Sequence, residues 1–304
     1  MRKINTEHIE AYKSGCFKKL FDVIKEDPDL SFEIRMNNEV IVYYRKCKIL
    51  TIKYNYSNHL IKRSVEILDS KYYSDSSKPS VSFDGALLDY TLDHKSLLEK
   101  YFKEAKKLVH AYKIGMEFEI QQNIALGNRD FNKRYLVVDM EWGFSQSGIP
   151  FDKRITKTRI DLVVVDTKPN SNGENDIYLD EIKVGTGAAE GKSGIVDHVR
   201  KTKELIGMKE ACKALKDDVD NILEQKIKLG LIAGTPVKLN LSSRPKMMLI
   251  LAYRGEDEKK CLEKHARIAA ESASEIGLER PNIIFHNALI ELKCTSQFIV
   301  EQTR

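Results

Sequence analysis

The sequence predicts an α/β protein built from two parts. Helical spacing of apolar residues alternates along the chain with short apolar segments of strand length. Near the N-terminus, strands follow one another with only short turns between them, which is typical of an antiparallel meander. From about residue 93, helices and strands alternate, and the fully apolar segment MMLILAY indicates an interior strand of a mixed sheet.

The first part is expected over residues 1–72 as a small α+β module. Helical spacing predicts one helix over 5–26, which Asp27-Pro28-Asp29 ends. The segments LSFEIR, EVIVYY and KILTIKY predict three short strands, with turns at 36–38 and 45–48. Residues 73–92 are interpreted as a linker, because this region is rich in Ser and contains a Pro and a Gly.

The second part is expected over residues 93–304. A helix over 95–125 precedes the strands YLVVDMEWGF, RIDLVVVD and IYLDEIKVG. A long helix from Ile195, with Ser193 as its N-cap, is followed by MMLILAY, a helix over 257–277 and the last strand NIIFHNA. The order α-β-β-β-α-β-α-β predicts a mixed sheet with helices on both faces.

The composition is that of an ordinary soluble globular protein, with 42% hydrophobic and 31% charged residues among 304. A formal net charge of +5 is compatible with a polyanionic partner. No apolar run reaches the roughly 18 residues of a membrane span, and the N-terminus lacks the apolar core of a signal peptide. Five scattered cysteines without a CxxC pair indicate reduced thiols in a cytoplasmic protein. GxxxxGK[ST], GxSxG and HExxH are absent, which argues against the classes of enzyme that depend on them.

One acid-x-Lys triplet, Glu181-Ile182-Lys183, stands on a predicted strand and has an acid, Asp161, on the strand before it. Period-two alternation places Glu181 and Lys183 on one face of that strand. The competing triplets lie in turns or helices or lack a partner acid. Examples begin at Asp93, Asp166, Glu224, Asp257 and Glu291.

Acids on neighbouring strands can hold a hard divalent cation, and a lysine beside them can contact a scissile phosphate. The backbone carbonyl of Ile182 is a further candidate ligand. The alternative is an ordinary cross-strand ion pair, in which Asp161 or Glu181 pairs with Arg159 or Lys183.

Further acids are candidates for the same site. Glu119 is expected on the inward stripe of the helix over 95–125, and Glu117 on its outer side. An inward carboxylate is costly unless it meets a cation, so Glu119 is predicted as a ligand or positioning group; the alternative is a helix-end glutamate that reaches solvent. Asp139 and Glu141 share one face of the preceding strand and are candidates for an outer position.

Two segments are candidates for contacts with phosphate. The loop before the Asp161 strand, SQSGIPFDKRITKTR, concentrates positive charge at Lys153, Arg154, Lys157 and Arg159. In GKSGIVDH, glycines flank a helix N-terminus whose free amides favour an anion, with donors from Lys192, Ser193 and His198. The alternatives are a solvated hairpin and an ordinary capped helix.

On these residues and this element order, the chain resembles the PD-(D/E)XK nuclease superfamily, the restriction-endonuclease-like fold, over about residues 95–290. The resemblance implies a helix glutamate, matched by Glu119, a strand aspartate, matched by Asp161, and a signature acid and lysine, matched by Glu181 and Lys183. Ile160 stands where the superfamily nominally has a proline. The stretch LDEIKVGTGAAEGKSGIVDHVRK is similar to a group of uncharacterised bacterial members.

The resemblance implies an α/β/α core and Mg²⁺-dependent hydrolysis of nucleic-acid phosphodiester bonds, with Mn²⁺ as a substitute and DNA as the favoured substrate of an endonuclease. Asp161, Glu181, the Ile182 carbonyl and Glu119 would hold the metal, and Lys183 would orient or help deprotonate the attacking water. Two alternatives stay open: a nuclease-like module that only binds nucleic acid or a protein, and an RNase. Cutting both strands requires two sites, so a homodimer is expected. The first part is expected to set specificity, mediate dimerisation or hold a protein partner.

Overall fold

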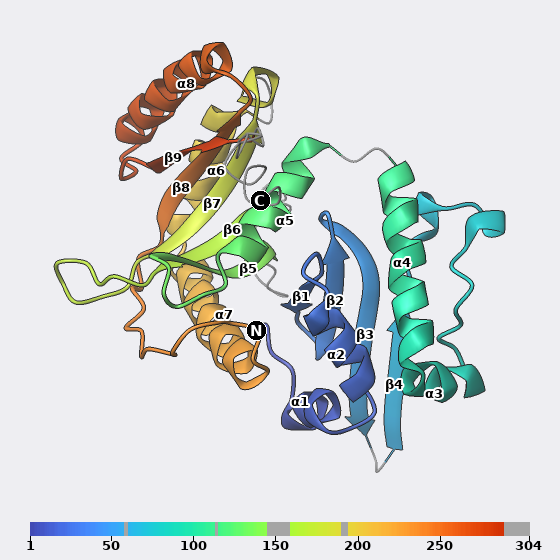
Figure 1. Ribbon diagram of the computed structural model, residues 1–304. Helices are drawn as coiled ribbons and strands as arrows, with labels where there is room; N and C mark the ends of the chain where they lie inside the picture. Colours follow the sequence, from blue (N-terminus) through green and yellow to red (C-terminus); the bar gives the residue numbers. More distant parts are fainter. Residues whose placement is uncertain (58–59, 113–114, 145–158, 190–193, 289–304) are drawn as a thin grey trace, which may run out of the picture.

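The computed structural model describes residues 1–57, 60–112, 115–144, 159–189 and 194–288, and it confirms the predicted α/β class (Figure 1). The described chain forms two sheets. One is antiparallel with the order β1-β2-β3-β4, and the other is mixed with the order β5-β6-β7-β8-β9. None of the helices in these ranges has the length and apolar character needed to cross a membrane.

The first sheet is a four-stranded meander, so the prediction of three strands is wrong by one. The fourth strand was missed because its centre, Lys62-Arg63-Ser64, is polar, as edge strands often are. The strands are β1 (Ser31–Ile34), β2 (Glu39–Tyr44), β3 (Cys47–Ser57) and β4 (Leu60–Glu66).

The turn between β2 and β3 consists of two residues, Arg45 and Lys46, because Tyr44 pairs directly with Cys47. Both turn residues have positive φ, 48° and 59°. A two-residue hairpin of type I′ requires this conformation, which Asn and Gly adopt more readily than Arg or Lys. We refer to this segment as the Arg45-Lys46 turn.

Four helices pack on the first sheet. The helix predicted over 5–26 is two helices, with the chain turning closely at Gly15, where a Cβ atom would lie 2.8 Å from the Cα of Ala11. Residues 73–92, interpreted as a linker, also pack here, with Val81 and Phe83 buried. The helices are α1 (Thr6–Lys13), α2 (Lys18–Glu26), α3 (Ala86–Asp93) and α4 (Lys95–Ala111).

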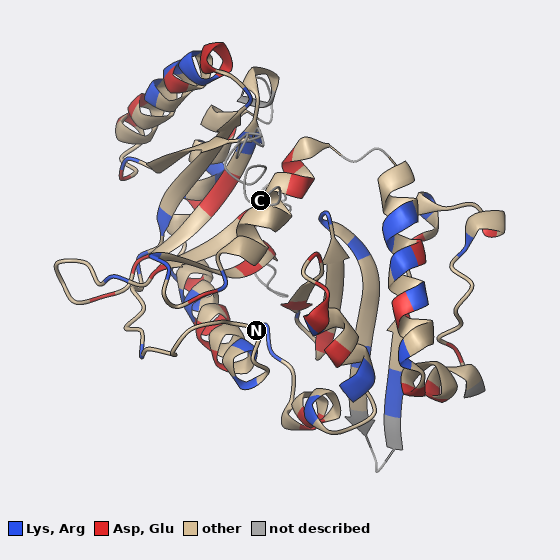
Figure 2. Ribbon diagram, in the orientation of Figure 1, with Lys and Arg blue, Asp and Glu red and all other residues tan. Residues whose placement is uncertain are grey.

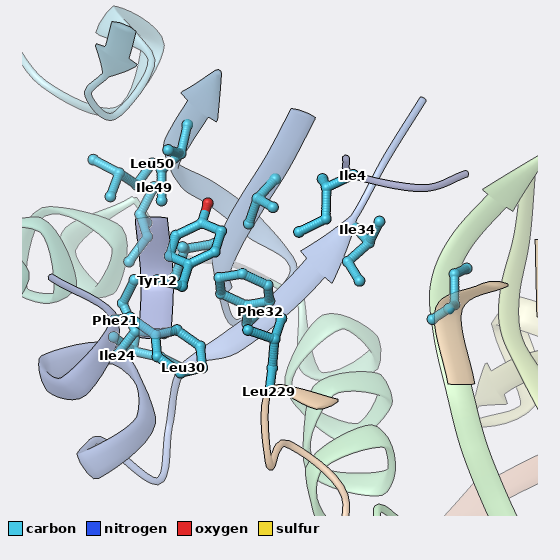
Figure 3. Close-up of a cluster of buried hydrophobic side chains, with 14 of the residues drawn as sticks. Ile4, Tyr12, Phe21, Ile24, Leu30, Phe32, Ile34, Ile49, Leu50 and Leu229 are labelled. Atoms are coloured by element: carbon cyan, nitrogen blue, oxygen red, sulfur yellow. The ribbon is translucent and has the colours of Figure 1, made fainter. Parts of the chain in front are cut away.

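Aromatic side chains fill the space between α1, α2 and the first sheet. Tyr12 and Phe21 of the helices meet Phe32 of β1, with ring centroids 5.1 to 5.4 Å apart (Figure 3). Leu229, from the second half of the chain, reaches the same cluster. The core of the first part is therefore completed by a side chain from the distant second half of the chain.

The second sheet has strands where the sequence predicts them. β5 runs antiparallel to β6 and β6 to β7, whereas β7, β8 and β9 are parallel, which confirms a mixed sheet. The apolar β8 lies inside it, between β7 and β9. The bounds are β5 (Tyr135–Gly143), β6 (Arg159–Asp166), β7 (Ile177–Val184), β8 (Lys246–Tyr253) and β9 (Asn282–Asn287).

Helices cover both faces of the second sheet, as predicted: α5 on one, α6 and α8 on the other (Figure 1).

Two predicted long helices are each broken at a glycine. The helix over 95–125 is α4 and α5, with Gly115 as the N-cap of α5, and the helix from Ile195 ends at Gly207 before α7 begins. The N-cap of α6 is Gly194, not Ser193. The bounds are α5 (Met116–Gly127), α6 (Ile195–Ile206), α7 (Lys209–Lys228) and α8 (Glu256–Glu275).

Two buried ionic clusters join the sheets. Glu33 of β1, fully buried, accepts hydrogen bonds from Arg129 and from Lys226 of α7, the latter with Nζ 2.9 Å from Oε2. Asp139 of β5 accepts hydrogen bonds from Arg2 and from Arg35, whose Nη1 lies 2.8 Å from Oδ1. Pairing of this kind is what makes buried charge tolerable, so the two sheets depend on each other's side chains.

The buried imidazole of His8 predicts a pH dependence of stability. His8 stacks on Tyr12 and Tyr54, and burial lowers its pKa to about 4. The unfolded chain, with an ordinary histidine pKa of about 6.5, takes up a proton first, so the stabilisation present at neutral pH is lost as the pH falls from about 6.5 to about 4. In urea denaturation, we expect the wild type to lose about 2 kcal/mol more than His8→Phe between pH 7 and pH 4.5. Equal acid losses in both proteins would contradict this.

Candidate metal centre

The centre lies where β6 and β7 separate. The two strands pair from Val165 and Ile177 as far as Leu162 and Asp180, and their ladder stops there. Asp161 and Glu181 are the next residues beyond this last pair, one on each strand. The backbone amide of Ile182 donates a hydrogen bond to Oδ2 of Asp161 at 3.0 Å, which holds the Asp161 carboxylate against the peptide that links Glu181 to Ile182.

The buried carboxylate of Glu181 contacts two nitrogen atoms, one at each of its oxygens. Its Oε1 lies 2.6 Å from Nζ of Lys183, and its Oε2 lies 2.9 Å from Nδ1 of His198 on α6. Glu181 and Lys183 therefore form an ion pair, as in the alternative interpretation, but the pair lies within β7 and does not cross between strands. Burial acts to lower the pKa of Lys183, but the charge and hydrogen bond of Glu181, together with the charges of Glu117 and Asp161, raise the pKa on balance, which keeps Lys183 an ammonium at neutral pH.

A second lysine enters the centre from the first sheet. Nζ of Lys46, in the Arg45-Lys46 turn, lies 2.8 Å from Oε1 of Glu141 and 3.1 Å from Oδ1 of Asp161. These two carboxylates raise the pKa of Lys46 to about 12, against the effect of burial. Gln121 of α5 completes this side, with Nε2 donating to Oε1 of Glu141 at 3.0 Å and to the Asp161 carbonyl at 2.8 Å. Glu141, a candidate for an outer position, thus belongs to the centre.

The helix glutamate that faces the centre is Glu117, not Glu119. Burial raises the pKa of Glu117, and its carboxyl interacts with the charges of Lys183 and Asp161. Glu119 is instead 42% exposed and pairs with Arg45, whose Nη2 lies 2.8 Å from Oε1. Glu119 does not take the inward position expected from one continuous helix, because α4 and α5 are separate helices and the stripe of one does not continue into the other. Figure 2 shows the acidic first turn of α5.

The strand also contributes a carboxyl that the sequence interpretation missed. Asp180 is fully buried, and within the described chain neither of its carboxyl oxygens has a hydrogen-bond partner. Burial, and then the charges of Asp161 and Glu181, raise its pKa well above the usual range. Alternation along β7 turns it away from Glu181, under α5, and its position in the DEIK run is the signal that could have drawn attention to it.

The other predicted residues have different places. Asp139 lies in the ionic cluster with Arg2 and Arg35 rather than in the centre. Arg159 is exposed, with Nη1 3.7 Å from Oε2 of Glu141, and His198 contacts Glu181. The remaining predicted phosphate contacts lie outside the described residues: Lys153, Arg154, Lys157, Lys192 and Ser193.

The centre brings together carboxylate oxygens, the donors that a hard divalent cation prefers. In the described ranges no three or more His, Cys, Asp or Glu side chains are arranged as a ready metal site, but Mg²⁺ is commonly held by one or two carboxylates plus water. Asp161, Glu181, Glu141 and Glu117 outnumber the two ammonium groups, and the Lys46 ammonium already sits between two of the carboxylates, as a cation would. No family model, no curated protein and no solved structure matches this chain.

Proposed function

We propose that the protein is a metal-dependent nuclease that hydrolyses nucleic-acid phosphodiester bonds, with DNA as the favoured substrate, on a restriction-endonuclease-like core. The observation that carries the proposal is the joint placement of Asp161, Glu181 and Lys183 where β6 and β7 separate. Acids on two strands with an adjacent ammonium are the groups needed to hold a hard cation next to a phosphate.

Asp161 and Glu181 would hold Mg²⁺, which lowers the pKa of bound water and neutralises charge on the phosphate oxygens. Lys183, kept charged by Glu181, stabilises the negative charge that develops on the phosphoryl oxygens. His198 fixes the second oxygen of Glu181, so that carboxylate and lysine keep a set orientation. Gln121 fixes the backbone at Asp161 in the same way.

The experiment that tests the function is a cleavage assay on labelled DNA and RNA, each single-stranded and duplex, with Mg²⁺, Mn²⁺ or EDTA. We expect cleavage with either metal and none with EDTA, with 5′-phosphate at the new ends. The absence of cleavage of every substrate with both metals would refute the proposal.

One observation favours a second function, a nuclease-like module that binds nucleic acid or a protein without cutting. The ammonium of Lys46 occupies the space between Glu141 and Asp161 that a cation would use. If it stays there, it blocks metal binding. Nucleic-acid binding without cleavage would support this alternative, and an RNase on the same scaffold is an outcome of the same assay.

The position of Lys46 predicts that it competes with metal. We expect Lys46→Met to tighten Mn²⁺ binding at least threefold, because the substitution removes a positive charge 3.1 Å from Oδ1 of Asp161. Titration calorimetry of the metal-free protein measures this. The matched control is Lys48→Met, which removes an exposed charge next to the same turn. Equal effects of the two substitutions on Mn²⁺ affinity would show that the Lys46 ammonium does not compete with metal.

A further inference from the structure

A groove of about 740 Å³ opens beside the centre, between the first sheet and the start of α5. Lys46 and Glu141 belong both to the centre and to this groove. The rest of its wall comes from β2, the start of β3, the end of β4 and the residues after it, the first turn of α5 and the start of β6. We call it the basic groove, after Lys46, Lys48, Lys71 and Arg159.

The basic groove carries positive charge that its own acids do not neutralise. Glu66 pairs with Lys53, Asp69 with Lys71 and Glu141 with Lys46. The exposed Lys48 has no ion pair with any part of the chain that the structure describes. Arg159 is 77% exposed, and the 3.9 Å pair of Lys71 with Asp69 is solvated and weak. Lys48, Lys71 and Arg159 are therefore available to an anion.

Aromatic rings accompany these cations. Phe118, on the first turn of α5, is 37% exposed and lies 4.7 Å below the ammonium of Lys46, measured to its ring centroid. Tyr72 is half-buried, and the edge-on ring of Tyr112, which is 51% exposed, contacts it at 4.8 Å between centroids. Exposed rings among cations are the combination that binds single-stranded nucleic acid, by stacking bases and neutralising phosphates.

The Arg45-Lys46 turn closes over the centre beside the groove. Arg45 pairs with Glu119 at 2.8 Å, and the backbone amide of Lys46 donates to Oε1 of Gln122 at 2.9 Å, so the turn is fixed to α5 at two points. A duplex is stiff over about 150 base pairs and presents its bases inward, so it cannot lay them on rings inside such a groove. A single strand is flexible and exposes its bases.

We propose that the basic groove binds a single strand of nucleic acid, with phosphates at Lys48, Lys71 and Arg159 and a base on Phe118, and leads it to the carboxylates. Cleavage of the bound strand rests on the proposed function, whereas binding of the strand does not. The substrate class of the centre is then single-stranded DNA or RNA, or an unpaired segment of a duplex.

Fluorescence anisotropy of the full-length protein in EDTA measures binding without cleavage. The probes are a short labelled DNA strand, the RNA of the same sequence, and the matching blunt DNA duplex. We expect at least one single strand to bind at least tenfold more tightly than the duplex. Lys48→Met with Lys71→Met should weaken strand binding at least tenfold and lower the slope of log affinity against log salt by about 1.4. Phe118→Ala should weaken binding at least fivefold.

Matched controls come from α8, with Lys259→Met plus Lys260→Met for the charges and Ile268→Ala for an exposed apolar side chain, 44% exposed. The inference is overturned if the duplex binds as tightly as the tighter of the two strands, or if the groove variants bind like the α8 controls. Strand binding that depends on the groove, without cleavage under any metal, would leave the groove standing and end the proposed nuclease function. Metal-dependent cleavage, together with groove variants that bind strands as tightly as the wild type, would support the proposed nuclease function and end the inference about the groove.

Discussion

Lys183→Met is expected to reduce metal-dependent cleavage by about 10²- to 10³-fold while leaving the fold intact. Losing one preorganised group that stabilises developing oxyanion charge costs about this much in enzymes. Lys183 is buried, is held 2.6 Å from Glu181 and carries a raised pKa, so it is a fixed positive charge rather than a mobile surface lysine. Methionine keeps the length and the apolar stem of the lysine side chain but removes its charge.

The matched control is Lys168→Met. Lys168 belongs to the acid-x-Lys triplet Asp166-Thr167-Lys168 at the end of β6, but it is exposed and has no place in the centre. We expect this variant to cleave like the wild type. Initial rates at saturating Mg²⁺, with circular dichroism to check folding, decide the question. Cleavage by Lys183→Met at the rate of the Lys168→Met control would remove Lys183 from the mechanism.

Glu33→Gln is expected to lower the free energy of unfolding by about 3–5 kcal/mol. The substitution keeps the shape of the side chain but leaves Arg129 and Lys226 as buried charges without a counter-charge. Lys226 is fully buried, and burial already lowers its pKa to about 8, a sign of how costly its charge is in this position. The effect should involve both sheets, because Glu33 lies on the first and Lys226 on α7, which packs on the second.

Urea denaturation measures the loss. The control is Glu39→Gln on β2, where the partner Lys53 lies 3.6 Å away at the surface, and there the loss should stay below about 1 kcal/mol. A Glu33→Gln protein as stable as this control would mean that the cluster does not contribute to holding the two sheets together.

The strands that carry the proposed chemistry could be predicted from sequence because each is a continuous apolar run ended by polar residues. RIDLVVVD coincides with β6, and IYLDEIKVG extends one residue beyond β7. The helix breaks at Gly15, Gly115 and Gly207 were missed, since a single glycine inside a helical pattern is tolerated and does not by itself mark the end of a helix. Missing the break before α5 then exchanged the roles of Glu117 and Glu119.

Lys46 could not be predicted as part of the centre. It lies 115 residues before Asp161, on a different sheet, and its local sequence indicates only a turn. Asp180 was missed for a different reason. It stands next to Glu181, but strand alternation alone assigns it to the opposite face, and only packing under α5 shows it to be buried with no hydrogen-bond partner among the described residues. Contacts between distant segments are set by tertiary packing, which local patterns do not encode.

Anomalous scattering from a crystal soaked with Mn²⁺ tests the central claim most directly. We expect a peak at the carboxylates of Asp161 and Glu181, with the Lys46 ammonium displaced from Asp161. A cleaving protein whose bound Mn²⁺ lies elsewhere, with Lys46 still bridging Glu141 and Asp161, would contradict the assignment of this centre.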